Sequence, residues 1–84
     1  MGKKEKITEL EKNLLGRYSL ITLVGNSELM VEGMRGILDY NSESLRVNTI
    51  SGVLLIMGAG LEITSLTAEE ISIKGKITSL EFCL

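Results

Sequence analysis

Few side chains in this sequence are suited to chemistry, and the most versatile type is missing. The 84 residues include no histidine and a single cysteine, Cys83. Histidine is the commonest general base and the commonest metal ligand, so its absence removes both roles. A lone cysteine forms neither an internal disulfide nor a Cys-x-x-Cys metal site, and Cys83 has no histidine to activate it. One cysteine fits a reducing compartment.

The remaining candidates for chemistry are two adjacent carboxylates and a glycine-containing loop. Glu69 and Glu70 could serve in acid–base catalysis, but no histidine or metal partner accompanies them, so we interpret them as a solvated turn. Gly58 and Gly60 weakly resemble a phosphate-binding loop, which requires a following helix where we predict a strand. We therefore predict that the protein is not an enzyme and has no catalytic, cofactor-binding or metal site.

The overall charge and the aromatic content argue against nucleic acid as a partner. Nine basic residues face eleven acidic ones, for a net charge of −2, whereas nucleic-acid binding calls for a clustered basic excess. The three aromatic side chains offer no platform for stacking bases. The longest apolar run, Val53–Met57, is far shorter than the ~20 residues of a membrane span. The N-terminus lacks the apolar stretch of a secretory signal, so we expect a soluble cytoplasmic protein.

The N-terminal segment has the pattern of an amphipathic helix. Ile7, Leu10 and Leu14 fall on one face of a 3.6-residue period, and Gly16 is placed to end the helix. So short a helix must dock to be stable. We expect it to contact the rest of the chain or another molecule. An anionic membrane surface is an alternative that we do not favour, because glutamates dilute the nearby lysines.

After Gly16 the pattern becomes that of β-strands, with apolar and polar residues alternating between turn residues. The single domain expected over residues 1–84 thus consists of an N-terminal helix (1–16) and a β module (17–84). Both faces of Val53–Met57 are apolar, so we expect this strand to be covered on both sides, by the helix, a second sheet or a partner. We predict eight strands, near residues 18–24, 28–34, 36–40, 45–50, 53–57, 61–66, 70–74 and 77–82.

An internal repeat accompanies the strands. Ile-Thr-Ser-Leu occurs at 63–66 and 77–80, and a broader offset of 16 relates four apolar residues, Leu29, Leu45, Leu61 and Ile77. One hairpin unit written about four times fits two architectures. The first is an all-β, mainly antiparallel meander that forms a small roll or sandwich with the short N-terminal helix. The second is a short β-solenoid.

The turn at Gly75-Lys76 favours the first architecture. A two-residue Gly-X loop is the type II′ signal of an antiparallel hairpin, and it would pair Ile73 with Thr78 and Ile71 with Leu80. A solenoid would instead stack parallel rungs.

Once catalysis and nucleic-acid binding are set aside, the role that the sequence indicates is contact with protein partners. So small a chain buries a modest core, and self-association would add buried surface, so we expect a homo-oligomer. Arg35 is a candidate anchor because it lies between two glycine-marked bends, although a solvated turn explains it equally well. The six candidate interface residues are Ile7, Leu10, Leu14, Arg35, Leu54 and Ile56.

Several short motifs carry a family resemblance through their order and spacing, which extends from about residue 21 to 82. They are Ile21-Thr22 with Val24-Gly25-Asn26, Arg35-Gly36-Ile37 with Tyr40, Arg46-Val47-Asn48-Thr49, Gly52, Gly58, and "EEISIKGKI" followed by Leu80-Glu81-Phe82. Together they resemble the YabP/YqfC family of bacterial sporulation proteins, and more closely its YqfC branch.

The resemblance implies a non-enzymatic protein of endospore-forming Firmicutes. It would act in the mother-cell cytoplasm, including the forespore periphery, in spore coat or cortex assembly. The expected partners are other sporulation proteins and further copies of the chain, reached by protein–protein interaction or self-assembly. The alternative is a peripheral adaptor that meets the membrane surface through the N-terminal helix. The resemblance transfers no catalytic residue.

Overall fold

Six antiparallel strands make up all the regular structure of residues 18–83, the part of the chain that the computed structural model describes. The prediction of an all-β fold is therefore confirmed for these residues. The strands are β1 (Leu20–Val24), β2 (Glu28–Glu32), β3 (Met34–Tyr40), β4 (Ser44–Thr49), β5 (Gly52–Leu66) and β6 (Glu70–Cys83).

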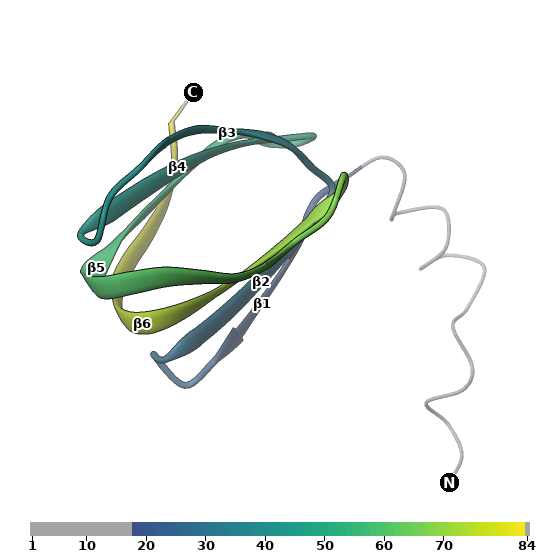
Figure 1. Cartoon of the computed structure of the whole chain (residues 1–84). Coiled ribbons are helices and arrows are strands. Elements are labelled where there is room, and N and C mark those ends of the chain that lie inside the picture. The colour runs from purple at the N-terminus through teal and green to yellow at the C-terminus, as the bar shows by residue number, and fades with distance from the viewer. Residues whose placement is uncertain (1–17, 84) are drawn as a thin grey trace, which may run out of the picture.

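The strands form one sheet in the order β1-β2-β6-β5-β4-β3. β5 and β6 are long and bend, so that they run through two layers (Figure 1). In one layer, β1 and β2 continue onto residues 70–74 of β6 and 62–66 of β5. In the other, β3 and β4 continue onto residues 52–57 of β5 and 79–83 of β6. The bent sheet therefore packs against itself.

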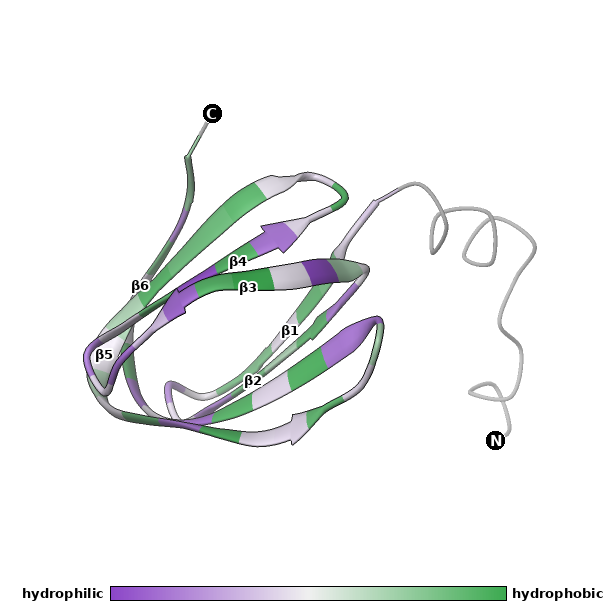
Figure 2. Ribbon diagram, turned by 45° about the horizontal axis from the view of Figure 1, so that its top comes forward, coloured by the Kyte–Doolittle hydropathy of each residue, from purple (hydrophilic) through white to green (hydrophobic). Residues whose placement is uncertain are grey.

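Hydrophobic and hydrophilic residues alternate along the strands (Figure 2). Because successive residues of a strand point to opposite faces of the sheet, the hydrophobic set forms a core between the two layers. Val47 lies opposite Leu54, and Leu45 opposite Ile56, and all four side chains are buried. Thr49 is a buried polar residue whose Oγ1 donates to the Gly52 carbonyl at 2.6 Å and accepts the N–H of Ser51 at 3.1 Å. The buried apolar residues are Leu29, Val31, Met34, Leu45, Val47, Leu54, Ile56, Leu61, Ile71, Ile73 and Ile77.

Glycines make the bend of β5 and β6 possible. A Cβ atom on Gly58 would lie 2.0 Å from the carbonyl oxygen of Lys76, so the two backbones touch where a side chain would have to fit. Gly75 has φ +142° and a Cβ there would lie 2.7 Å from the carbonyl oxygen of Gly60. The register of the pair shifts on both sides of this contact. Only glycine permits such an approach.

The two short hairpins dock on this bend in the same way. The carbonyl oxygen of Ser27, in the β1–β2 loop, accepts the N–H of Gly75 at 3.1 Å. The carbonyl oxygen of Glu43, in the β3–β4 loop, accepts the N–H of Gly58 at 3.0 Å. A second bond accompanies each, from Ile77 to Asn26 and from Leu61 to Ser42. The loop positions differ by 16 residues, so the repeat in the sequence reflects equivalent hairpins in the two layers.

The predicted topology was wrong in its details. The segments 53–57 and 61–66 are one strand, β5, and the segments 70–74 and 77–82 are another, β6. Gly75-Lys76 is therefore no hairpin turn: Ile73 pairs with Leu29 and Ile63 rather than with Thr78. The glycines supply a bend inside a continuous strand, and the β1–β2 loop accepts hydrogen bonds from Gly75 and Ile77 at this bend.

The predicted meander and solenoid are corrected as well. β3 to β6 are sequential neighbours, but β2 crosses over to pair with β6, so the sheet is not a simple meander. Every pair is antiparallel, which excludes the solenoid for the described strands. No helix occurs in residues 18–83, and the helix predicted over residues 1–16 lies outside them.

A glycine pair tests the importance of the bend. We expect Gly58→Ala to lower the free energy of unfolding by at least about 3 kcal/mol, because the new Cβ meets a backbone oxygen. Gly36→Ala is the matched control, since a Cβ at Gly36 in β3 meets nothing within 4 Å, and we expect a change below about 1 kcal/mol. Urea denaturation followed by circular dichroism measures both. Equal effects of the two changes would refute this account of the bend.

Candidate partner-binding edge

The groups that sequence reasoning weighed for chemistry do not converge. Cys83 is exposed at the end of β6, and Glu69 precedes that strand at its other end. Among residues 18–83, no three His, Cys, Asp or Glu side chains lie close enough together to hold a metal ion. The same residues contain no helix long and apolar enough to cross a membrane. The absence of catalysis and of cofactors stays a prediction.

One ion pair joins β3 to β4 on the outer surface. The Nη2 and Nε atoms of Arg46 lie 2.6 Å and 2.8 Å from Oδ2 of Asp39. The hydrogen bond that Arg46 donates to Asp39, and then the negative charge of Asp39, raise the pKa of Arg46 above its ordinary value. Both side chains are about half exposed, so solvent screens the pair and it contributes little to stability. The pair places charged side chains on and beside the edge strand β3.

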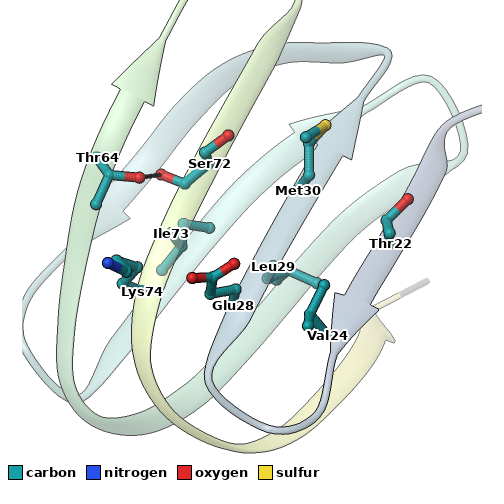
Figure 3. Close-up of a pocket in the computed structure, with 9 residues that line it drawn as sticks. All are labelled: Thr22, Val24, Glu28, Leu29, Met30, Thr64, Ser72, Ile73 and Lys74. Carbon is teal, nitrogen blue, oxygen red and sulfur yellow. Dashed lines mark hydrogen bonds between the residues drawn. The ribbon is translucent and has the colours of Figure 1, made fainter.

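A surface depression lies on the outer face of β1, β2, β6 and β5 (Figure 3). Thr22 and Val24 of β1 line one side, and Met30 of β2 stands next to them. Glu28 and Lys74, which are opposite each other in the register of β2 and β6, also line the depression. This mixture offers apolar contacts and two opposite charges.

The predicted interface residues have different locations. Ile7, Leu10 and Leu14 lie outside the described residues. Leu54 and Ile56 are 1% and 0% exposed and form part of the core. Arg35 is exposed on β3, beside a second depression, next to Glu32, Glu69 and Glu70. No observation tests the interface role, which stays a prediction for these residues.

The two faces of the segment Val53–Met57 differ in burial, although both are apolar. Leu54 and Ile56 point inward, whereas Met57 is exposed and Val53 and Leu55 are half-buried on the outer face. Within residues 18–83 no second layer covers this outer face, contrary to the expectation of cover on both sides. The sequence of this segment alone does not tell the inner face from the outer face. The pairing with β4 does, because the buried residue Val47 lies opposite Leu54.

The two ends of the strand order, β1 and β3, differ in protection. β3 has two register shifts against β4 and carries the charges of Arg35 and Asp39. Bulges and charges are the usual means by which proteins prevent a free edge from pairing with another chain. β1, with the sequence Leu-Ile-Thr-Leu-Val, has neither, and its register with β2 is regular. β1 is therefore the open edge.

The bend leaves two further strand segments with one unpaired side. Residues 62–66 of β5 and 79–83 of β6 pair only with each other's strand. Each segment contains a glutamate, Glu62 or Glu81, whose charge disfavours pairing with an added strand. Among the free edges of residues 18–83, β1 is thus the one without a charge.

β1 is held in place at both ends. The N–H of Ser19 donates to Oγ of Ser51 at 3.0 Å, and Oγ of Ser19 donates to the carbonyl oxygen of Gly33 at 3.2 Å. At the other end, the N–H of Ser27 donates to the carbonyl oxygen of Val24 at 3.2 Å. The outward backbone groups of β1 are thus held in an extended strand before any partner binds. Strand addition therefore costs β1 little conformational entropy.

Apolar side chains surround these backbone groups. Leu23 lies opposite the buried Leu29 and so faces the core, yet its side chain is 45% exposed because the sheet ends at β1. Leu20 and Val24 are exposed on the outer face. Sequence reasoning did not single out β1: its lack of charge was visible, but its edge position depends on the strand order.

Comparison with known proteins assigns this fold to a family. The model of the YabP family matches residues 16–83. The chain belongs to the YabP family. No curated protein sequence matches it.

Membership of the YabP family suggests a sporulation-related protein. The matched residues include all six strands, so the open edge and the protected edge both belong to the YabP-family region. The assignment to the YqfC branch stays a prediction. Segment 1–16 lies outside the described residues, so the structure does not bear on the membrane-surface alternative.

Hydrogen exchange tests whether the edge of this YabP-family sheet is open. Alternate residues of an antiparallel strand direct their N–H groups away from the neighbouring strand. At low protein concentration we expect alternate β1 amides to exchange within the fastest class, whereas Ile71 and Ile73 in the central strand β6 exchange slowest. Nuclear magnetic resonance resolves the individual amides. Uniform protection along β1 would contradict an open edge.

Proposed function

We propose that this YabP-family protein is a non-enzymatic interaction module of sporulation that binds partners by strand addition at β1. The observation that carries the proposal is the contrast between the edges: β3 is bulged and charged, whereas β1 is regular, uncharged and anchored at both ends. Strand addition uses the backbone hydrogen bonds of such an edge for affinity.

The surface beside β1 supplies the means of selecting a partner. In strand addition, specificity comes from sites for the alternate side chains of the added strand. Thr22 and Val24 point from β1 to the outer face and line the depression that continues over Met30 (Figure 3). On the other face, the exposed side of Leu23 offers an apolar contact. An added strand with apolar residues on both faces fits these two surfaces.

The setting that we propose is the one that the resemblance to the YabP/YqfC family implies. The protein acts in the mother-cell cytoplasm, including the forespore periphery, in assembly of the spore coat or cortex. Its partners are other sporulation proteins and further copies of itself. Family membership supports the link to sporulation, and the scarcity of reactive side chains in the sequence supports a role in binding rather than catalysis.

Matched leucine variants test the binding edge. Leu23 on β1 and Leu38 on β3 are similarly exposed, at 45% and 49%, and circular dichroism verifies that both lysine variants keep the fold. Partners are captured from sporulating cells with the tagged full chain, identified by mass spectrometry and purified. We expect Leu23→Lys to weaken binding of a purified coat or cortex protein by at least about tenfold, because a lysine blocks an edge. Leu38→Lys should bind as the wild type does. Equal loss in both variants, or in neither, would argue against β1 as the binding edge.

The cell compartment has its own test. A fluorescent fusion expressed from the native promoter during sporulation should give signal in the mother cell, because the proposed partners assemble around the forespore from that side. Fluorescence microscopy with a membrane stain separates the two compartments. Signal confined to the forespore interior would refute the proposed setting.

A further inference from the structure

We infer that two copies of the chain pair through β1, antiparallel and around a two-fold axis at Thr22, to form a closed dimer. The inference rests on the proposed function, since it names one partner of the same edge. It goes further by giving the register, the symmetry and the size of the assembly.

The alternation of faces restricts the register. Ile21 and Leu23 lie on the core side of β1, because they pair with Val31 and Leu29, whereas Thr22 lies on the outer side. Directly opposite residues in an antiparallel pair lie on the same side of the sheet, so the axis must pass a residue and not the midpoint between two. Centring it on Thr22 pairs all five residues of β1; centring it on Ile21 or Leu23 leaves ends unpaired.

This register covers the exposed flank of the core. Leu23 faces the core side but is 45% exposed at the end of the sheet. In the dimer, Ile21 of the second copy lies directly opposite Leu23, and the reverse contact follows by symmetry. The two core-side rows then continue across the axis without a polar residue. A second copy therefore fits the apolar flank that a single copy leaves in water.

The outer face of the pair is equally free of conflict. Thr22 lies opposite its own copy, a favourable cross-strand pair, and Leu20 lies opposite Val24. β1 carries no charge, so no like charges meet directly across the axis. An unrelated strand would need this complementarity by chance, whereas β1 contains it within its own five residues.

The protected edge explains why the assembly closes. Pairing β1 with β3 of the next copy would be a head-to-tail contact, which leads to open filaments unless the rotation closes a ring. β3 resists it through its register shifts and the charges of Arg35 and Asp39. An isologous contact at β1 uses the open edge of both copies, so growth stops at two. A contact of five residues per strand is small, and we expect a weak dimer.

Sedimentation equilibrium of the full chain at concentrations up to about 1 mM tests the dimer. The mean mass should rise to twice the monomer mass and stay there. Thr22→Lys should weaken dimerisation by roughly tenfold, because it sets two like charges opposite each other at the axis, and Thr22→Glu should do the same. Position 22 is exposed, so both variants keep the fold, which circular dichroism verifies.

An equimolar mixture of Thr22→Lys and Thr22→Glu is the decisive sample. It should regain wild-type association or better, because lysine then faces glutamate across the axis. Ser79→Lys, on the exposed outer side of β6, is the control and should associate as the wild type does. A mixture no stronger than its components overturns the register at Thr22. A chain that stays monomeric, or one whose mass grows beyond two copies, overturns the closed dimer.

The same measurements separate this inference from the proposed function. A monomeric chain whose Leu23→Lys variant loses a coat or cortex protein overturns the dimer and supports the proposed function. A dimer with the expected charge exchange at position 22 that binds no sporulation protein supports the inference and counts against the broader role.

Discussion

The contact between the backbones of β5 and β6 at their common bend is the constraint on which the structure depends. Gly58 and Gly75 leave no room for a side chain, because a backbone carbonyl oxygen occupies the space that a Cβ would need. This approach lets one long hairpin serve both layers of the sheet. The β1–β2 and β3–β4 loops then bond to the N–H groups that the bend frees, and in doing so place the two edge strands. The positions of both edge strands, β1 and β3, thus depend on the contact between β5 and β6 at the bend.

The alternation of apolar residues was sufficient to predict the β content and much of the core. Leu45, Val47, Ile71 and Ile73 each alternate with polar residues in the sequence, and all four are buried in the structure. Their strands carry polar residues on the other side, so periodicity has one solution. Where both faces of a strand are apolar, as at Val53–Met57, either set of alternate residues could face the core. Only the pairing with the neighbouring strand decides which set does.

The strand order was beyond the reach of local signals. Gly75-Lys76 has the chemistry of a tight turn, yet the segment continues as a strand because the β1–β2 loop bonds to Gly75 and Ile77 from outside. That contact joins residues about fifty positions apart in the sequence. The open edge was missed for the same reason: whether an uncharged strand such as β1 is central or free depends on which strands flank it. Tertiary contacts here override local turn preference.

The late position of β6 in the chain has a consequence for synthesis on the ribosome. β2 pairs with β1 on one side and with β6 on the other, so the β1–β2 hairpin emerges early and waits until β6 has been translated before its inner side is covered. Until then the nascent polypeptide exposes Leu29 and Val31 to solvent, and chaperones compete with misfolding for such segments. Non-local pairing of this kind also slows folding. The strand order that leaves β1 as a free edge therefore also creates an interval during synthesis in which apolar residues of β2 are uncovered.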